Sequence, residues 1–484
     1  MSLTYLLWCL LGTGYGFIIG LVPVAGVSTA LIAIFGFLDY FRHDPYSLVV
    51  FTTSIVVACA IGDNFSSIVM NIPGSAGSAA TMIDGFPMAK KGLAAHALSA
   101  AIFTSVGNGL LWGAITFVFM PYYKNVVLLF NVPELLAFVL VAFTSVCFIT
   151  NDKWGRGIIA LLLGIFVGLI GQDPNTGAHR YTLGWDYIAT GIQITPVMAG
   201  ILAFPELIET YFSKKDAFVV KIIDTKKQIV DGFWDSVRYW RDGFRGGAIG
   251  AAIGLLPGVG GSVADWVAYG QTVSAHPNEK IPFGEGNIKG VIGCEGSNNA
   301  QKATGYIPTI LFGIPAAPFE AIIMALFIYV GLEMGTPTLL NDSYFFDMLT
   351  ASYMISLVLT LIISLICIKH VDKIFKVPFK VWFWILTALI TWSCVQYTGY
   401  WEDYSMLLIC ILVGFALKRW QFSRAAFIIG FVLSDRIEKL FYQYNTLYNW
   451  EEIFFRPISA GLIAVMLLLI IKGLFFNNTR ITYS

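Results

Sequence analysis

Apolar segments long enough to cross a lipid bilayer follow one another along most of the chain. Residues 93–120, 347–368 and 458–475 are examples, and roughly 18 apolar residues are enough for a spanning helix. The hydrocarbon layer holds no water, so each segment must satisfy its own backbone N–H and C=O groups. Only 12% of the residues are charged, whereas soluble proteins carry about 25%. We therefore predict an all-α polytopic membrane protein.

The overall charge and the distribution of metal-binding residue types exclude two classes of function. Lysine plus arginine and aspartate plus glutamate both number 30, so the chain has no net positive charge that would favour nucleic acid. The seven cysteines form no C-x-x-C pair, and the five histidines form no cluster with metal-ligand spacing. We expect no cofactor and no metal beyond a possible Na⁺.

The chain contains an internal repeat of about 234 residues. Residues 250–264, set against residues 16–30 without gaps, match at eight of fifteen positions. The matching pairs are Gly16/Gly250, Ile19/Ile253, Gly20/Gly254, Leu21/Leu255, Pro23/Pro257, Gly26/Gly260, Ser28/Ser262 and Ala30/Ala264. We divide the chain into a first membrane repeat (1–212), a polar linker (213–245) and a second membrane repeat with C-terminal helices (246–484).

The linker, residues 213–245, is the one long polar stretch. It holds eight basic residues against five aspartates, so the positive-inside rule places it in the cytoplasm. Its Trp234, Tyr239 and Trp240 suit an interfacial helix at the level of the lipid headgroups. If each repeat crosses the membrane an odd number of times, the two halves are inverted relative to each other, and we predict that arrangement.

Residues 62–92 interrupt an apolar segment with residues that break a helix. Pro73 removes a backbone hydrogen bond, and Gly74 allows backbone angles that other residues avoid. A single Gly or Pro in a membrane helix usually marks a kink. Here the small residues 75–80 follow, and irregular backbone in a membrane is tolerated only inside protein or beside a watery cavity. We interpret the stretch as half of a binding site, followed by a turn at residues 84–87.

The second half contains a similar break, because Gly313-Ile314-Pro315 echoes Asn71-Ile72-Pro73. The residues at the two breaks that we predict to bind substrate are Asn71, Pro73, Gly74, Ser75, Asn298, Asn299, Gly313 and Pro315. The neighbouring residues with side-chain oxygens that are candidates for ion coupling are Asp63, Asn64, Thr81, Asp84 and Glu295. The earlier breaks, expected to act as hinges, lie at Pro23, Gly26, Pro257, Gly258 and Gly260.

Duplicated membrane halves with paired helix breaks are the architecture of secondary transporters, which bind substrate near the membrane midplane. The broken or re-entrant helices expose unpaired N–H groups and the positive end of the helix dipole, so such a site favours an anion. Carbonyl groups freed at the other helix ends can hold a coupling cation, Na⁺ or H⁺. The pattern predicts alternating access to a midplane site.

Charged side chains inside the membrane are costly, so Asp63, Glu295 and Glu320 are functional candidates. Glu320 has a second interpretation, as a cap on the helix that follows Pro318. Lys302 is expected either to pair with Glu295 or to extend towards the membrane surface.

Three separated motifs resemble the large membrane subunit of the tripartite tricarboxylate transporters of bacteria. The first is N-x-P-G…T-x-x-D-G-x-P-M, matched by Asn71, Pro73, Gly74, Thr81, Asp84, Gly85, Pro87 and Met88. The second is G-x-D-P-x-x-G-x-x-R-[FY]-T-x-G, matched by Gly171, Asp173, Pro174, Gly177, Arg180, Tyr181, Thr182 and Gly184. The third comprises residues 256–260, Glu295 with residues 298–300, and the FRPI sequence within residues 454–458. The likeness covers nearly the whole chain.

The resemblance implies a multi-pass protein of the bacterial inner membrane that takes up an organic carboxylate, driven by a Na⁺ or H⁺ gradient. It also implies two partners, a small membrane subunit and a periplasmic solute-binding protein. This chain departs from the family pattern at Val24, at Gly296-Ser297 and at Ala316, where the family usually has glycine, alanines and glycine. These departures alter the pocket lining, so the resemblance implies a tricarboxylate or dicarboxylate without singling out citrate.

Two other functions compete with this interpretation. One is a self-sufficient secondary anion transporter that needs no binding protein. The other is a membrane-embedded enzyme, but the sequence has no G-x-S-x-G motif and no paired histidines to support catalysis. A G-x-x-x-x-G-K-[ST] loop is also absent from the sequence, which agrees with transport that does not use ATP. We predict a transporter rather than an enzyme.

Overall fold

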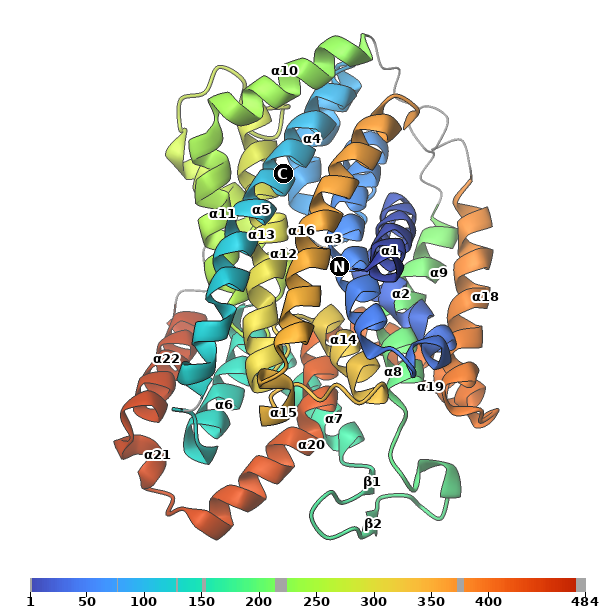
Figure 1. Cartoon of the computed structure of the whole chain (residues 1–484), viewed down its shortest axis with the longest axis vertical. Helices are drawn as coiled ribbons and strands as arrows, with labels where there is room; N and C mark the ends of the chain where they lie inside the picture. The colour runs from blue at the N-terminus through green and yellow to red at the C-terminus, as the bar shows by residue number, and fades with distance from the viewer. Residues whose placement is uncertain are drawn as a thin grey trace.

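The protein is built almost entirely from α-helices (Figure 1). A computed structural model describes residues 2–75, 77–127, 129–149, 154–213, 224–371 and 378–475. Within these ranges the only strands are the two-residue β1 (Gly171–Gln172) and β2 (His179–Arg180), which pair antiparallel. Five described helices are long and apolar enough to cross a membrane. The all-α membrane fold predicted from the apolar segments is confirmed at this level.

The first half runs from α1 to α9. Its helices are α1 (Leu3–Leu21), α2 (Gly26–Ile32), the 3-10 helix η1 (Ala33–Phe41), α3 (Pro45–Met70), α4 (Ser78–Lys90), α5 (Ala94–Val127), α6 (Val132–Ile149), α7 (Trp154–Gly168), the 3-10 helix η2 (Asp186–Ile188), α8 (Ile194–Met198), the π-helix η3 (Ala199–Ala203) and α9 (Phe204–Phe212).

The linker contains α10 (Thr225–Arg238). The helices of the second half are α11 (Trp240–Gly254), α12 (Gly261–Ala275), α13 (Ile288–Tyr306), the π-helix η4 (Ile307–Leu311), α14 (Pro318–Tyr329), α15 (Pro337–Leu340), α16 (Ser343–Ile368), α18 (Phe379–Thr398), α19 (Glu402–Arg419), α20 (Arg424–Leu447), α21 (Glu452–Phe455) and α22 (Pro457–Phe475).

Glycines four residues apart let the first helix of each half lie directly against the third. A Cβ at Gly16 of α1 would come within 2.7 Å of the backbone of Ile55 in α3. A Cβ at Gly250 of α11 would come within 2.4 Å of the backbone oxygen of Ser297 in α13. Small residues permit such close helix packing in membranes, and this explains why these glycines recur in both repeats.

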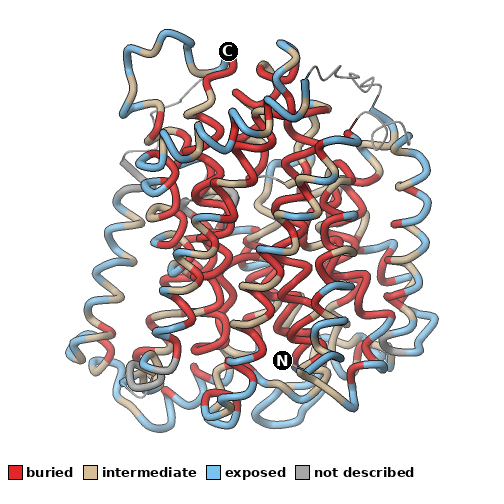
Figure 2. The backbone as a smooth tube through the Cα atoms, turned by 45° about the horizontal axis from the view of Figure 1, so that its top comes forward, coloured by how far each residue is buried: buried red, intermediate tan, exposed pale blue. Residues whose placement is uncertain are grey.

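The two halves interlock rather than stand apart. Helix α5 of the first half packs on α13, and α16 of the second half packs on α3. Buried residues are concentrated along these inner helices, and the outer helices expose much of their surface (Figure 2). The core that positions the site is therefore shared between the halves.

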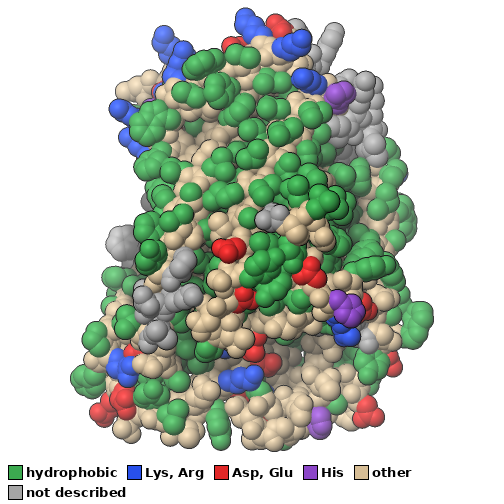
Figure 3. Space-filling model, in the orientation of Figure 1, with side chains coloured by type: hydrophobic (Ala, Val, Ile, Leu, Met, Phe, Trp, Pro, Cys, Tyr) green, Lys and Arg blue, Asp and Glu red, His purple; other side chains and the backbone are tan. Residues whose placement is uncertain are grey.

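The two ends of the molecule differ in charge and in structure. Helix α10 lies across one end, and the β1–β2 loop projects from the other (Figure 1). Side chains of lysine and arginine gather at the α10 end, and apolar side chains cover the middle of the face shown (Figure 3). Residues 214–223 of the linker lie outside the described residues, and α11 already begins at Trp240, within the stretch assigned to the linker.

The structure corrects the expected extent of the first break. Helix α3 continues through Asp63 and Asn64 to Met70, so the helix breaks only at Asn71. Residues 84–87, expected to form a turn, lie inside α4, and that prediction is wrong. Pro87 removes one N–H donor and crowds the preceding turn, but the helix continues to Lys90. The buried Asp84 on the same helix accepts three N–H groups of a facing loop.

Candidate functional site

Two pairs of broken helices meet in the interior and join through backbone hydrogen bonds. In the first half, the Val24 N–H between α1 and α2 donates to the Pro73 carbonyl, at 3.2 Å. In the second half, the Gly258 N–H donates to the Pro315 carbonyl at 3.3 Å. These bonds satisfy backbone groups that the prolines and the helix ends leave free. Each half thus forms the same crossing of two breaks.

The backbone conformations at the breaks repeat as well. Left-handed φ angles occur at Val24 (68°) and Gly26 (56°), and again at their counterparts Gly258 (83°) and Gly260 (75°). Asn71 (57°), which ends α3, corresponds to Gly313 (64°). The breaks are therefore built features of both halves, since residues other than glycine and asparagine rarely adopt this conformation.

Val24 is the exception, because a β-branched residue is strained at positive φ, by roughly 1–2 kcal/mol. We expect Val24→Gly to raise the melting temperature of the purified protein, with a net stabilisation of about 1 kcal/mol after the chain-entropy cost of glycine. Val22 is the matched control, since it is buried and has a φ of −79°. Val22→Gly should lower the melting temperature, and a fall for both variants would contradict the strain at Val24.

The tips of the two breaks, which are the turns at Gly74 and Ala316, carry matching side-chain caps. Ser67 Oγ accepts the Gly74 N–H and Thr309 Oγ1 accepts the Ala316 N–H, both at 3.4 Å. One residue further on, Ser78 Oγ accepts the Ser75 N–H at 3.0 Å. Thr309 and Ala316 lie 242 residues after Ser67 and Gly74 and make the equivalent hydrogen bond in the second half.

A cavity of about 480 Å³ opens where the two crossings meet. Its lining includes Gly26, Asp63 and Ser75 from the first half and Gly260 and Lys302 from the second. The volume lies within the range of about 300–1,000 Å³ that is usual for small-molecule sites. Residues at the start of α4, α12 and α14 also line it, so the positive ends of three helix dipoles point at one space.

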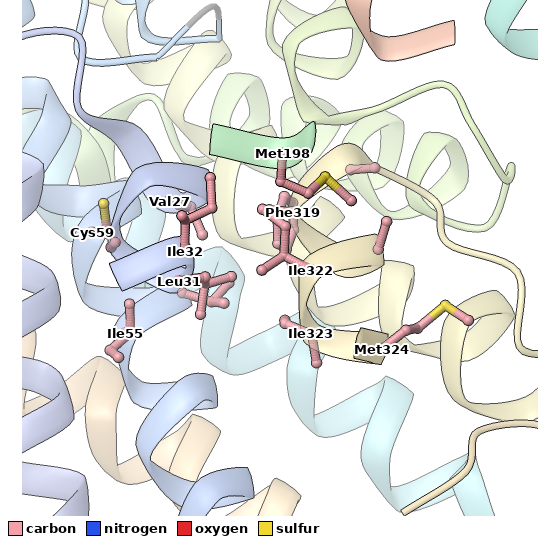
Figure 4. Close-up of a cluster of buried hydrophobic side chains, with 14 of the residues drawn as sticks. Val27, Leu31, Ile32, Ile55, Cys59, Met198, Phe319, Ile322, Ile323 and Met324 are labelled. Atoms are coloured by element: carbon pink, nitrogen blue, oxygen red, sulfur yellow. The ribbon is translucent and has the colours of Figure 1, made fainter. Parts of the chain in front are cut away.

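An apolar core supports one wall of this cavity. Side chains of α2, such as Leu31 and Ile32, lie opposite Phe319 and Ile322 of α14, with Met198 beside them (Figure 4). All five are buried. Helix α2, after a break of the first half, is therefore fixed against α14, which follows a break of the second half.

Lys302 is the only lysine or arginine that is buried in the described part of the chain. It neither pairs with Glu295 nor extends to the membrane surface, so both expectations for it are wrong. Its ammonium group donates to the carbonyl and to the side-chain oxygen of Asn298, one helical turn away. Helical spacing explains this, since residues i and i+4 lie on one face of α13.

Glu295 lies at the centre of a buried network between the halves. Its carboxylate accepts hydrogen bonds from Asn64 at 2.7 Å, from Asn298 at 3.1 Å and from Thr81. Asn298 also donates to the Ala60 carbonyl, at 2.9 Å. The structure thus brings together four predicted site residues from α3, α4 and α13.

The predicted substrate-binding residues fall into two groups. Gly74 and Ser75 line the cavity. The others are placed as follows: Asn71 is exposed at the end of α3, Pro73 and Pro315 carry the crossing hydrogen bonds, Gly313 is buried near Met334, Asn298 holds Lys302, and Asn299 faces Ser105 of α5. Their roles towards a substrate stay predictions.

Among the ion-coupling candidates, Asp63 lines the cavity and Asp84 does not. One Asp84 oxygen accepts the N–H groups of Gly284, Gly286 and Asn287 at 2.8–3.0 Å. The other accepts the Tyr269 hydroxyl at 2.9 Å. This carboxylate therefore anchors the loop between α12 and α13 to α4.

The second sequence motif forms an ordered loop at the end opposite α10. The Arg180 guanidinium forms a bidentate ion pair with Glu438 of α20 and also donates a hydrogen bond to Asp173. The N–H groups of Asn175 and Thr176, together with Arg180, hold the pKa of Asp173 below its ordinary value. The motif residues thus fix the loop to the helical body.

Three cavity-lining or capping residues did not emerge from the sequence. Asp265 and Gln301 line the cavity, and Ser78 caps the first tip. An acidic residue four positions after Gly261, inside an otherwise apolar stretch, was the available signal for Asp265. Ser78 and Gln301 are common polar types, and only the equivalence between the repeats singles them out.

Comparisons with known proteins place the chain in a family. A family model described as "Tripartite tricarboxylate transporter TctA family" matches residues 6–429. A protein of Agrobacterium vitis named "Uncharacterized 52.8 kDa protein in TAR-I ttuC' 3'region" is 28% identical over 97% of this chain and 93% of its own length. Another from that organism, "Uncharacterized protein in TAR-II ttuC' 3'region", is 29% identical over 46% of this chain and 93% of its own length. No solved structure matches the chain.

Proposed function

This chain belongs to the tripartite tricarboxylate transporter TctA family, and we propose that it is the large membrane subunit of a secondary transporter that takes up an organic carboxylate with the help of a solute-binding protein. The observation that carries the proposal is the cavity at the meeting point of the paired breaks. Lys302 lines it together with the starts of three helices. Positive helix ends and one buried cation favour a bound anion.

The test is uptake by proteoliposomes that contain this chain and its small membrane subunit. Labelled citrate, and a panel of other tricarboxylates and dicarboxylates, is supplied with the periplasmic binding protein. We expect uptake that requires the binding protein and a Na⁺ or H⁺ gradient and that proceeds without ATP. Uptake of equal rate without the binding protein would favour the self-sufficient carrier. Chemical conversion of the carboxylate without transport would favour the enzyme.

We infer that the two halves are inverted and give alternating access to the cavity. The direction of the third helix in each half supports this. Asn64 of α3 contacts Glu295 of α13, whereas the earlier residue Ala60 contacts the later residue Asn298. The two helices therefore cross antiparallel, although they occupy equivalent places in the repeats. Inverted repeats around a midplane site are the basis of alternating access in many carriers.

The orientation in the inner membrane follows from the charged end. Helix α10 and the basic linker belong in the cytoplasm by the positive-inside rule, and the β1–β2 loop at the other end then faces the periplasm. We expect a cysteine at Leu183 to react with a membrane-impermeant maleimide in intact cells. A cysteine at Lys226 on α10 should react only after permeabilisation. Both sites are exposed, and the reverse labelling pattern would overturn this orientation.

Few native thiols would react in that labelling experiment. Six of the seven native cysteines are buried, and Cys367 is half-buried. Replacing Cys367 with serine therefore leaves few thiols that an impermeant reagent can reach, and the parent protein with this one change serves as the unlabelled control.

The loop after β2 is the surface we assign to the periplasmic binding protein. Leu183 is 99% exposed and has a φ of 51°. A strained, fully exposed leucine gains nothing in the isolated subunit, and such outliers cluster at functional positions. Burial of the Leu183 side chain under a partner protein would add the favourable free energy of apolar contact.

We expect Leu183→Glu to lower binding-protein-dependent uptake about tenfold, the effect of losing roughly 1.4 kcal/mol at an interface. The measurement is initial uptake rate against binding-protein concentration. Binding of the free carboxylate to the purified carrier should be unchanged, since Leu183 does not line the cavity. An unaltered concentration dependence would remove this loop from the docking surface.

A further inference from the structure

Two buried carboxylates, Asp63 in the lining of the cavity and Glu320 next to the lining residues 317–319, come from different positions of the two repeats. Residues 63 and 305 are equivalent, and so are residues 78 and 320. The Ser67 hydroxyl donates to the carbonyl of Asp63, as the Thr309 hydroxyl donates to that of Gly305. Asp63 supplies the carboxylate at the first tip, where the capping position holds Ser78. Glu320 supplies it at the second tip, where glycine replaces the aspartate.

At the second tip, one carboxylate oxygen of Glu320 accepts three hydrogen bonds and the other accepts none from the described residues. Oε2 accepts the N–H groups of Ala316 at 2.6 Å and Ala317 at 2.9 Å, and the Thr309 hydroxyl at 2.9 Å. This confirms the capping role expected for Glu320. Oε1 is buried and has no hydrogen-bond partner among the described residues.

Gln301 and Gly305 surround this free oxygen. Both polar atoms of the Gln301 side chain are buried and also unpaired within the described chain. A Cβ at position 305 would lie 2.2 Å from Glu320 Oε1 and 3.5 Å from the Gln301 nitrogen. Glycine therefore leaves room for a carboxylate oxygen and an amide that have no partner of their own.

The first tip also has a buried carboxylate with a free oxygen. Oδ1 of Asp63 is buried without a hydrogen-bond partner among the described residues, as is the side-chain oxygen of its neighbour Asn64. Gly74 lies directly against Asp63, since a Cβ there would come within 2.3 Å of the Asp63 Cβ. Each tip thus combines a free carboxylate oxygen with a glycine that lies against the acidic residue.

The charges around these carboxylates do not balance. Lys302 acts on both carboxylates, and Glu295 and Asp265 act on Asp63 as well, so among the described residues one buried cationic side chain accompanies these four acids. Arg424 also lines the cavity but is paired with Glu206. Lys302 already donates to Asn298. An ionised carboxylate without a partner in a membrane interior costs several kcal/mol. Four ionised acids against one lysine leave three negative charges uncompensated, so an anionic substrate needs bound cations before it can enter.

We propose that Asp63 and Glu320 each bind one small monovalent cation, Na⁺ or H⁺, at the free oxygen, so that two cations accompany each carboxylate. This rests on the proposed function and adds its coupling sites and their number. The two sites flank the cavity from opposite repeats. Placing the cations beside the tips links closure of both tips on the substrate to occupancy by the ions.

The experiment measures cation binding to the purified full chain without substrate. ²²Na⁺ binding is counted at pH 8 in choline chloride, and proton uptake is followed with an indicator dye in Na⁺-free solution. We expect two cations per wild-type chain in one of these two arms, which identifies the ion. Asp63→Asn and Glu320→Gln should each reduce the number to one, and the double variant to none. Glu451→Gln, at an exposed glutamate, is the control and should bind two.

A second variant guards against misfolding of the charge-neutralised proteins. Gly305→Ala keeps every carboxylate but fills the space beside Glu320 Oε1, so it should reduce the number to one as well. One cation per wild-type chain, or two in either single variant, would overturn the paired sites. If the wild type takes up carboxylate yet binds no cation, this inference fails alone. If it binds two cations yet moves no carboxylate, the proposed function fails alone.

Discussion

Replacing Gly74 with valine should abolish carboxylate uptake while the protein still inserts into the membrane. A Cβ at this position would lie 2.3 Å from the Cβ of Asp63 and 2.9 Å from its Cα. The tip cannot move away freely, because the preceding Pro73 carbonyl is bonded to Val24. The added side chain therefore displaces Ser75 and Asp63, which line the cavity. We expect uptake to fall at least 100-fold, since misplacing a binding group by about 1 Å is enough for such a loss.

The matched control is Gly14→Val in α1, where no heavy atom lies within 4 Å of the added Cβ. That variant should retain near-normal uptake. The amount of each variant in the membrane is measured by quantitative blotting, so that rates refer to equal protein. Uptake above one tenth of normal for Gly74→Val would remove the first tip from the binding site.

The sequence made the repeat visible because glycine carries a steric requirement that no other residue meets. Gly16 and Gly250 recur because a side chain at either would enter the backbone of the facing helix. The left-handed angles at Gly26 and Gly260 impose a similar limit. Such positions tolerate little change, so the first two helices of each half align without gaps.

The equivalence of the third helices showed in the sequence only at the breaks that follow them, where Gly313-Ile314-Pro315 echoes Asn71-Ile72-Pro73, because the connecting segments differ in length. Asp63 corresponds to Gly305, a spacing of 242 rather than 234 residues, and the residue types differ as well. The acidic residue is at position 63 in the first repeat but at position 320, the counterpart of Ser78, in the second. This difference could be found only from matching hydrogen bonds, such as those at Ser67 and Thr309. The sequence predicted costly buried acids but not which of their oxygens lack partners.

Contacts between residues far apart in the sequence could not be predicted for the same reason. Asp84 matched a family motif and read as an ion ligand, yet it anchors a loop 200 residues away. Lys302 was expected to pair with Glu295 because of their opposite charges, but its ammonium group donates to the oxygens of Asn298, which lies closer on the same face of the helix. Local spacing decides such contacts only within one helix, whereas the fold decides which helices face each other.

Lys302→Met should weaken carboxylate binding at least 100-fold, because Lys302 is the only buried cationic side chain in the described part of the protein. It shares the cavity with the acids Asp63 and Asp265, and the other cation in the lining, Arg424, is already paired with Glu206. Without Lys302 an anion would therefore enter a space dominated by negative charge. Removing one partner from a buried charged group commonly costs 3–5 kcal/mol. The measurement is the dissociation constant of citrate, or of the best substrate from the uptake panel, by calorimetry.

The same substitution also destabilises the protein, so the two effects must be separated. Lys302→Met with Asp265→Asn removes one charge of each sign and should recover most of the melting temperature that the single change loses. Binding should stay weak in this pair if Lys302 attracts the substrate directly. Lys289→Met, at a lysine that pairs with Glu279 outside the cavity, controls for loss of a lysine as such. Normal affinity in the double variant would show that Lys302 only balances Asp265, and the anion would then be held by the helix ends alone.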